Sequence, residues 1–203
     1  MRWQRGRFGG ICERGLSAKI ILDLCGGTGA WSAPYKTGYD VRLITLPEQD
    51  VRLFVPPLNV HGILAAPPCT EFSFAKHYHG KGNYKHDFAE GLSIVDACLR
   101  LVTICKPEWW VLENPRGYLR RWLGKPTLSF NPWQYGENYQ KATDLWGQFT
   151  MPKPTHLKPA GQLKKFSMLL NHEIAPEYSH LSRTERRAIT PARFAQAFFK
   201  ANP

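Results

Sequence analysis

The sequence lacks the features that would place it in a membrane or in a disulfide-stapled secreted fold. No run reaches the roughly 18 consecutive apolar residues that a spanning helix needs, so we expect no membrane segment. The basic residues 1–10 have no apolar run behind them and do not read as a secretory signal. The five cysteines include no CxxC pair and are odd in number, which argues against a zinc site or a disulfide framework. A reducing, cytoplasmic compartment is the natural expectation.

Acidic residues are scarce relative to basic ones. The chain has 27 Lys and Arg against 16 Asp and Glu, a formal charge of +11, and a pI near 9.6. This excess favours a polyanionic partner, most simply nucleic acid, although a merely basic soluble protein is the alternative. A chain of 203 residues is expected to form one domain with a modest appendage, and we favour a monomer.

Short apolar runs alternate with stretches of helical character. The runs predict buried strands at 19–24, 41–46, 62–66 and 109–112, a weaker strand at 51–55, and another at 144–150. Helical spacing predicts a helix at 89–105, and helices are also expected to begin at 30–35 and to span 184–187 and 191–200. This alternation predicts an α/β, Rossmann-like fold with a mostly parallel sheet and helices on both faces. Ligands bind such sheets at the carboxyl ends of the strands.

Composition divides the chain into four segments. We expect a basic N-terminal arm at 1–17, the main domain at 18–150, an irregular segment at 151–182 and helices at 183–203 that pack back on the main domain. Within the main domain, residues 70–88 are polar, basic and aromatic and are expected to form a long loop.

A glycine-rich turn follows the first predicted strand and leads into a predicted helix. Its residues are Asp23, Leu24, Cys25, Gly26, Gly27, Thr28 and Gly29. Glycines allow a tight turn and close approach of a ligand, and a helix start offers free amide donors. The spacing fits neither a phosphate-binding P-loop nor the dinucleotide fingerprint. A tight turn without any ligand remains the alternative.

A cysteine follows two prolines directly after the predicted strand at 62–66. Pro67 and Pro68 restrict the backbone, so the thiol of Cys69 is presented from a stiff base at the ligand-binding edge. Basic surroundings lower the pKa of a thiol and make it a nucleophile; the alternative is a small buried hydrophobe. The basic residues downstream are Lys76, His77, His79, Lys81, Lys85 and His86. These histidines complete no familiar ligand spacing, so we expect no metal.

Glu113 stands at the end of the predicted strand at 109–112. A carboxylic acid near Cys69 could hydrogen-bond N3 of a cytosine, which makes C6 electrophilic toward the thiolate. C5 could then attack a sulfonium methyl group. This chemistry needs a nucleophile, an acid and a methyl donor at adjacent strand ends. An exposed Glu at a strand end, without function, is the alternative.

Together the three motifs resemble the cytosine-C5 DNA methyltransferase family, most closely its small phage or prophage members. The resemblance covers most of residues 18–147, with a weaker tail at 185–201. It implies that Cys69 attacks C6, that Glu113 contacts N3, and that S-adenosylmethionine is the cofactor. The cofactor site that it implies comprises Asp23, Leu24, Cys25, Gly26, Gly27, Thr28, Gly29, Trp31, Asp50, Val51, Pro67 and Thr190.

The chain departs from the family's pattern at several places. Cys25 stands where the family usually has Phe, and Ala30 where it often has Gly. The family's Gln-x-Arg-x-Arg motif becomes Tyr139, Lys141 and Thr143; we assign the last two to the catalytic site, with altered contacts to cytosine O2 and phosphate. Only residues 151–188 stand where the family has a large target-recognition region.

The resemblance implies DNA as the partner and cytosine C5 methylation with low sequence specificity. One alternative keeps the chemistry but uses a free cytidine nucleotide or RNA, because the recognition region is short. Another is a catalytically inactive nucleic-acid-binding homologue, because the two arginines are replaced. The implied location is the cytoplasm of a bacterium or a phage-infected host cell.

Overall fold

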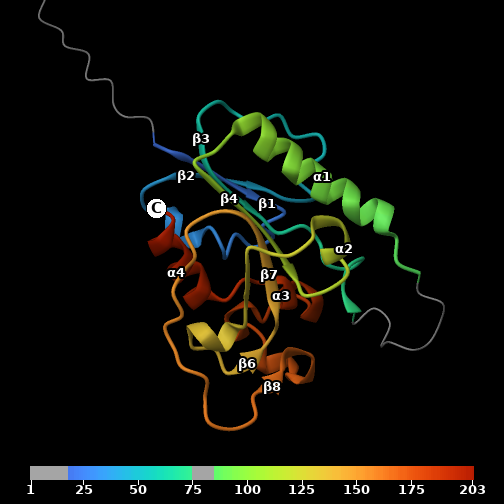
Figure 1. Cartoon of the computed structure of the whole chain (residues 1–203), viewed down its shortest axis with the longest axis vertical. Coiled ribbons are helices and arrows are strands. Elements are labelled where there is room, and N and C mark those ends of the chain that lie inside the picture. The colour runs from blue at the N-terminus through green and yellow to red at the C-terminus, as the bar shows by residue number, and fades with distance from the viewer. Residues whose placement is uncertain (1–17, 75–84) are drawn as a thin grey trace, which may run out of the picture.

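The computed structural model describes residues 18–74 and 85–203 (Figure 1). The predicted arm at 1–17 therefore lies outside the described residues, as do Lys76, His77, His79 and Lys81 of the predicted basic loop. None of the helices in the described ranges is long and apolar enough to cross a membrane.

A six-stranded sheet forms the centre of the molecule, in the order β2-β1-β3-β4-β7-β5. The first four strands along this order run parallel, whereas β7 runs antiparallel to both of its neighbours. This arrangement confirms the α/β class with a mostly parallel sheet. The strands are β1 (Ile20–Leu24), β2 (Asp40–Ile44), β3 (Val60–Ala65), β4 (Trp109–Pro115), β5 (Leu128–Phe130) and β7 (Thr143–Gln148).

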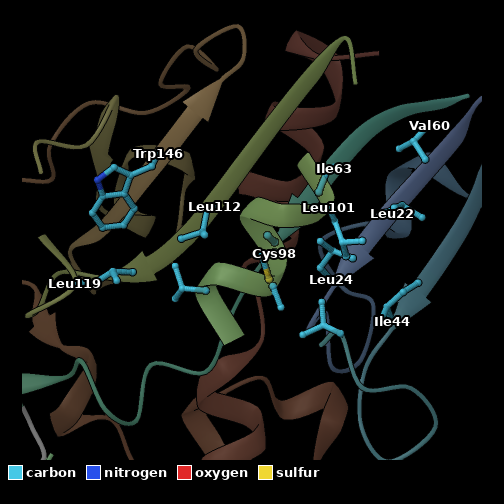
Figure 2. Packing of buried hydrophobic residues seen from close by; sticks show 14 of the residues in the cluster. Leu22, Leu24, Ile44, Val60, Ile63, Cys98, Leu101, Leu112, Leu119 and Trp146 are labelled. Atoms are coloured by element: carbon cyan, nitrogen blue, oxygen red, sulfur yellow. The ribbon is translucent and has the colours of Figure 1, made fainter. Parts of the chain in front are cut away.

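One face of the sheet is covered by α1 (Phe88–Cys105), as Figure 2 shows. Cys98 and Leu101 of this helix pack against Leu22, Ile63 and Leu112 of the strands. The side chain of Asp87 accepts a hydrogen bond from the amide of Glu90 and so caps the start of the helix. The predicted helix at 89–105 is confirmed.

The opposite face is covered by α4 (Ala192–Ala201). Phe194 and Phe198 pack against Ile21, Leu64 and Val111, each one residue away in sequence from a side chain that faces α1. Successive side chains of a strand point to opposite faces, so strands that are apolar throughout need cover on both. The predicted closing helices are confirmed as α3 (Arg183–Ala188) and α4.

Two local predictions were wrong. Residues 51–55 form a turn and irregular backbone rather than a strand, and Pro56 and Pro57, which follow, cannot donate to a sheet ladder.

The helix expected from 30–35 is only the 3-10 turn η1 (Ala33–Tyr35). Residues 30–39 alone connect Gly29 to β2, which leaves no room for a longer helix, and Pro34 removes an amide donor. No α-helix start therefore offers amides beside the glycine turn.

The segment 151–182 is irregular, with a small apolar cluster of its own. Phe166, Leu169 and Ile174 pack together, and Tyr139 packs against them. A two-stranded pair that the sequence did not predict, β6 (Tyr139–Gln140) with β8 (Lys164–Lys165), joins this cluster to the main domain. The strand β5 was likewise not predicted. The remaining short elements are α2 (Arg120–Leu123), η3 (Pro132–Tyr135), η4 (Phe166–Met168), η5 (Asn171–Glu173) and η6 (Pro176–Tyr178).

Candidate active site

Three motif-bearing segments lie at the carboxyl ends of three adjacent parallel strands: two follow β1 and β3, and Glu113 lies in β4, directly after the last residue that pairs with β3. Leu24, at the end of β1, is in register with Ala65, at the end of β3, and Ala65 is in register with Leu112 of β4. The glycine turn, the Pro-Cys loop and Glu113 therefore lie along the same edge of the sheet. This is the edge at which ligands bind in α/β folds.

The backbone around Cys69 is tied to the end of β4. The buried side-chain amide of Asn114 donates to the carbonyl of Pro67 at 3.0 Å. The carbonyl of Cys69 accepts from the amides of Phe72 and Ser73 at 3.0 and 2.9 Å, which closes one tight turn. These bonds tie the turn that carries the half-buried thiol to Asn114, the residue after Glu113 in β4.

The loop after β4 also packs directly on this turn. The amide of Tyr118 donates to the carbonyl of Phe72 at 2.7 Å. A Cβ on Gly117 would lie 2.2 Å from the same carbonyl oxygen, so only glycine permits this approach. The position of Cys69 thus depends on both loops.

The side chain of Glu113 lines a small pocket beside β4. Lys141, Thr143 and Thr190 share its lining with Glu113, so the structure brings together three of the predicted catalytic residues and one predicted cofactor residue. The remaining lining residues are Phe130, Pro132, Ala188, Ile189, Pro191 and Phe194. Buried Thr143 donates its hydroxyl to the carbonyl of Lys141 at 2.9 Å and so shapes the backbone that carries the Lys141 ammonium.

Burial and nearby charges set the protonation of the two candidate catalytic groups. Burial raises the pKa of the Cys69 thiol, and the Glu113 carboxyl raises it further, whereas Lys141 and Arg187 lower it. Burial also raises the pKa of Glu113, with Lys141 acting in the opposite direction and Asp144 in the same direction. A carboxyl that keeps its proton can donate a hydrogen bond to a ring nitrogen, and a cation beside the thiol favours the thiolate.

The turn after β1 combines a buried acid with open space. Asp23 is fully buried; one of its carboxyl oxygens accepts from the hydroxyl of Ser32 at 2.5 Å, and the other has no partner. Burial raises its pKa to about 6. A Cβ on Gly26 would lie 2.2 Å from the Asp23 carboxyl, whereas nothing lies within 4 Å of the Cβ position of Gly27. The open approach at Gly27 and the unpartnered acid oxygen fit a bound polar cofactor.

The other predicted cofactor residues differ in their surroundings. Leu24 and Val51 are buried in the core, as is Trp31, whose ring lies 5.7 Å from that of Phe198. Asp50 pairs with Arg52 at 2.7 Å. Cys25 is half-buried in a left-handed conformation, with φ of 57°. Their roles toward a cofactor remain predictions, as does that of exposed Thr28.

Two further residues contribute to the site, and of these the sequence did not single out Arg187. Asn114 positions the Cys69 loop, and Arg187 acts on the thiol. The sequence gave little indication of a role for Arg187, because Arg187 is one of several basic residues in α3. Asn114 belongs to the Glu113-Asn114 pair that contributes to the family resemblance. No group of three His, Cys, Asp or Glu side chains in residues 18–74 and 85–203 could hold a metal ion.

No model of a known protein family matches the sequence, and no curated protein matches it either. One similar solved structure is from a prophage (E. coli) and is provisionally described as a DNA modification methyltransferase. It is 15% identical, with a TM-score of 0.49 over 70% of this chain. The chain covers 53% of that protein, about half of its length. Function therefore has to be inferred from the site itself.

Proposed function

We propose that this chain is an S-adenosylmethionine-dependent methyltransferase that acts on C5 of cytosine in DNA. The observation that carries the proposal is the proximity of Cys69, in the loop that follows β3, to Glu113, which lies within the adjacent parallel strand β4. They lie close enough for the charge of Glu113 to raise the pKa of the thiol, and Lys141 acts on both. A nucleophile, an acid and a cation thus occupy one edge of the sheet.

In the proposed reaction, the Cys69 thiolate forms a bond to C6 of the cytosine. The C5–C6 double bond shifts to C4–C5, and the electron pair of the C4–N3 double bond moves to N3, which takes the proton of Glu113. C5 is then the nucleophilic carbon of an enamine. S-adenosylmethionine, when bound, supplies the methyl group on a positively charged sulfur. C5 then bonds to this methyl carbon as the carbon–sulfur bond of the donor breaks and leaves its electron pair on the donor sulfur, and N3 returns its proton to Glu113. A water molecule would take the proton from C5, and the electrons of that C–H bond re-form the C5–C6 double bond. The bond between Cys69 and C6 breaks in the same step, and its electron pair returns to the sulfur of Cys69.

The turn after β1 is where we place the cofactor. Gly27 and Gly29 would let it approach the backbone, since their φ angles of 55° and 70° are left-handed and space is open at Gly27. The unpartnered oxygen of Asp23 would accept a hydrogen bond from it. Thr190 would approach from the C-terminal segment, beside Glu113.

DNA is the substrate that the charge of +11 favours. A base in a duplex has to flip out of the stack to reach Cys69, as in other enzymes that modify bases. The small irregular segment 151–182 offers few elements for reading base edges, so we expect low sequence discrimination. The same feature favours a free cytidine nucleotide or RNA as a second candidate substrate.

Trapping with 5-fluorocytosine tests the proposal, because fluorine at C5 cannot leave as the proton does. The protein is incubated with S-adenosylmethionine and DNA that contains 5-fluorocytosine, and the adduct is mapped by mass spectrometry. We expect a covalent adduct at Cys69 that is absent from Cys69→Ala and present in Cys105→Ala, the matched control at a half-buried thiol in α1.

Parallel reactions with dCMP, CMP and transfer RNA separate the candidate substrates. Methylation of only one of these compounds would replace DNA as the substrate. An adduct on another cysteine, or methylation by Cys69→Ala, would show that the assigned nucleophile is wrong. No transfer to any of the four substrates would leave the inactive, nucleic-acid-binding homologue as the better account.

A further inference from the structure

We propose that Lys141 and Arg187 together form an anion site that holds a phosphate group of the substrate beside Cys69. This inference rests on the proposed function in one respect: the substrate is a nucleotide, either free or within a strand. The family resemblance already implies a phosphate contact at Lys141, and the new assignment is a direct role in binding the substrate for Arg187, from the C-terminal segment.

Contacts between distant parts of the chain bring the two cations to one aromatic ring. The ammonium of Lys141, just before β7, donates to the main-chain carbonyl of Arg187 in α3 at 3.0 Å. Both cations also face the ring of Phe166: the Lys141 nitrogen lies 5.1 Å and the Arg187 guanidinium carbon 5.5 Å from its centroid. One aromatic ring therefore supports two positive charges.

Neither cation forms an ion pair with an acid within the described residues, although the charge of Lys141 acts on Glu113 in the same pocket. Arg52, Arg120 and Lys164, by contrast, all form one. Like charges held close together repel each other, and the face of a ring offsets this repulsion only in part. Both side chains are half-buried and not closed off, so an anion can reach them from solvent.

Their location points to the substrate and not to a remote surface. Lys141 lines the same pocket as Glu113, and so does Ala188, which follows Arg187. Both cations lower the pKa of the Cys69 thiol, which places their charge near its sulfur. A nucleotide whose base meets Glu113 therefore presents its phosphate to a pair of cations.

The chemistry of the two side chains suits a phosphate. The guanidinium of Arg187 can donate two parallel hydrogen bonds to phosphate oxygens, and the ammonium of Lys141 adds a compact charge. A phosphate monoester of a free nucleotide and a phosphodiester of a strand share this chemistry. Separate arms of the experiment distinguish the two sources.

Protection of Cys69 from alkylation reads out this site without any methyl transfer. Iodoacetamide labelling of Cys69 is followed by peptide mass spectrometry in rising concentrations of deoxycytidine, dCMP or the trinucleotide d(ACA). We expect at least one phosphate-bearing ligand to protect at concentrations about tenfold or more below deoxycytidine, the scale of a charge-assisted hydrogen bond. Which of the two protects identifies the source of the phosphate.

The preference for phosphate should depend on Arg187. We expect Arg187→Ala to remove it, Arg187→Lys to retain part of it, and Lys141→Gln to weaken it. Arg42→Ala is the matched control, since Arg42 lies on β2, at the far edge of the sheet, and should keep the full preference. For each variant, the ligand concentration that gives half-maximal protection is compared between deoxycytidine and the phosphate-bearing ligands. A change in the intrinsic reactivity of the thiol therefore does not affect the comparison. Melting curves identify variants that fail to fold.

Equal protection by deoxycytidine and both phosphate-bearing ligands would overturn the anion site, as would an unchanged preference in folded Arg187→Ala. The outcome is separable from that of the proposed function. An adduct with 5-fluorocytosine in the absence of any phosphate preference defeats only the anion site. A phosphate preference that depends on Arg187, without adduct or methylation, defeats only the methyltransferase.

Discussion

Two groups with opposite requirements share the site. Cys69 has to lose its proton to attack, whereas Glu113 has to carry one in order to give it to the substrate. Burial raises the pKa of both, which suits Glu113 and opposes Cys69. Lys141 and Arg187 act against the effect of burial at the thiol but do not cancel it, because the pKa of Cys69 stays raised. Cations beside a buried sulfur are therefore part of what the chemistry demands.

Removing the proton donor at Glu113 should slow the chemical step. We expect Glu113→Gln to lower the rate of methyl transfer by about two to four orders of magnitude, the usual contribution of a general acid. The measurement is single-turnover transfer of a labelled methyl group to DNA. Cofactor binding by calorimetry should stay near that of the unmodified protein. An undiminished rate would remove Glu113 from the mechanism.

Asp23 gives the fold a dependence on pH. Its pKa rises from 3.8 to about 6 on burial, so the folded state disfavours the charged form. The contribution of neutral Asp23 to the free energy of unfolding is therefore fully present below pH 3.8 and is lost as the pH rises through about 6. Asp23→Asn cannot ionise, so its free energy of unfolding relative to the unmodified protein should increase by about 3 kcal/mol between acid and neutral pH.

Urea titrations of both proteins at several pH values measure this difference. Asp40→Asn, at a carboxyl on β2 that is not buried, is the control and should show a smaller change. A constant difference for Asp23→Asn across the range would contradict the assigned pKa.

At the scale of elements, the loops that follow β3 and β4 hold each other in place. Asn114 reaches back to Pro67, and the amide of Tyr118 reaches Phe72. Gly117 permits this contact because it has no side chain. The position of Cys69 is therefore a property of two segments that are distant in sequence.

A methyl group at Gly117 should disturb both stability and catalysis. We expect Gly117→Ala to lower the free energy of unfolding by about 1–3 kcal/mol, because its Cβ would collide with a backbone oxygen that cannot move alone. Methyl transfer should fall as well, because Cys69 shifts with the turn. Gly38→Ala is the matched control, since nothing lies within 4 Å of its Cβ position. Equal denaturation midpoints for the two variants would refute the clash.

At the scale of the whole molecule, α4 and the residues after it contact both early and late parts of the main domain. Phe198 of α4 packs against Trp31 and Trp109. The hydroxyl of Tyr35 donates to the carbonyl of Asn202 at 2.7 Å, and the Asn202 side chain bonds to the backbone of Thr150. Residues 192–203 thus cover a sheet face that would otherwise be apolar and exposed.

Truncation of this packing should be costly. We expect Phe198→Ala to lower the free energy of unfolding by about 3–5 kcal/mol, the range for large core aromatics, because Phe198 is fully buried. Chemical denaturation measures the loss, and exposed Lys200→Ala on the same helix is the control. A loss no larger than that of the control would mean that α4 is not part of the folded core.

The net charge of +11 should govern nucleic-acid affinity. We expect the logarithm of the DNA association constant to fall linearly with the logarithm of salt concentration, by about 0.9 for each phosphate contact. Fluorescence anisotropy with a labelled duplex at several KCl concentrations gives the slope, and Arg187→Ala should reduce it. An affinity that does not change with salt would exclude charge as the driving force.

The sequence alone was sufficient for the strands of the central sheet that are apolar throughout, and for α1 and α4. Their periodicity reflects burial on one or both faces, which is a local property of the chain. The same reasoning placed Cys69 and Glu113 at one edge, because parallel strands end together. It failed at 51–55, where Leu53 and Val55 are exposed in a turn ahead of two prolines although Val51 is buried.

Only the tertiary structure decided which distant residues complete the site. Arg187 reaches Lys141 and Phe166 because α3 and the cluster around Phe166 pack next to the start of β7. Neither spacing nor residue type distinguishes Arg187 from the other basic residues of α3. Periodicity reports on neighbours along the chain, whereas a cation pair beside a thiol arises when segments far apart in sequence are brought together by the burial of the core.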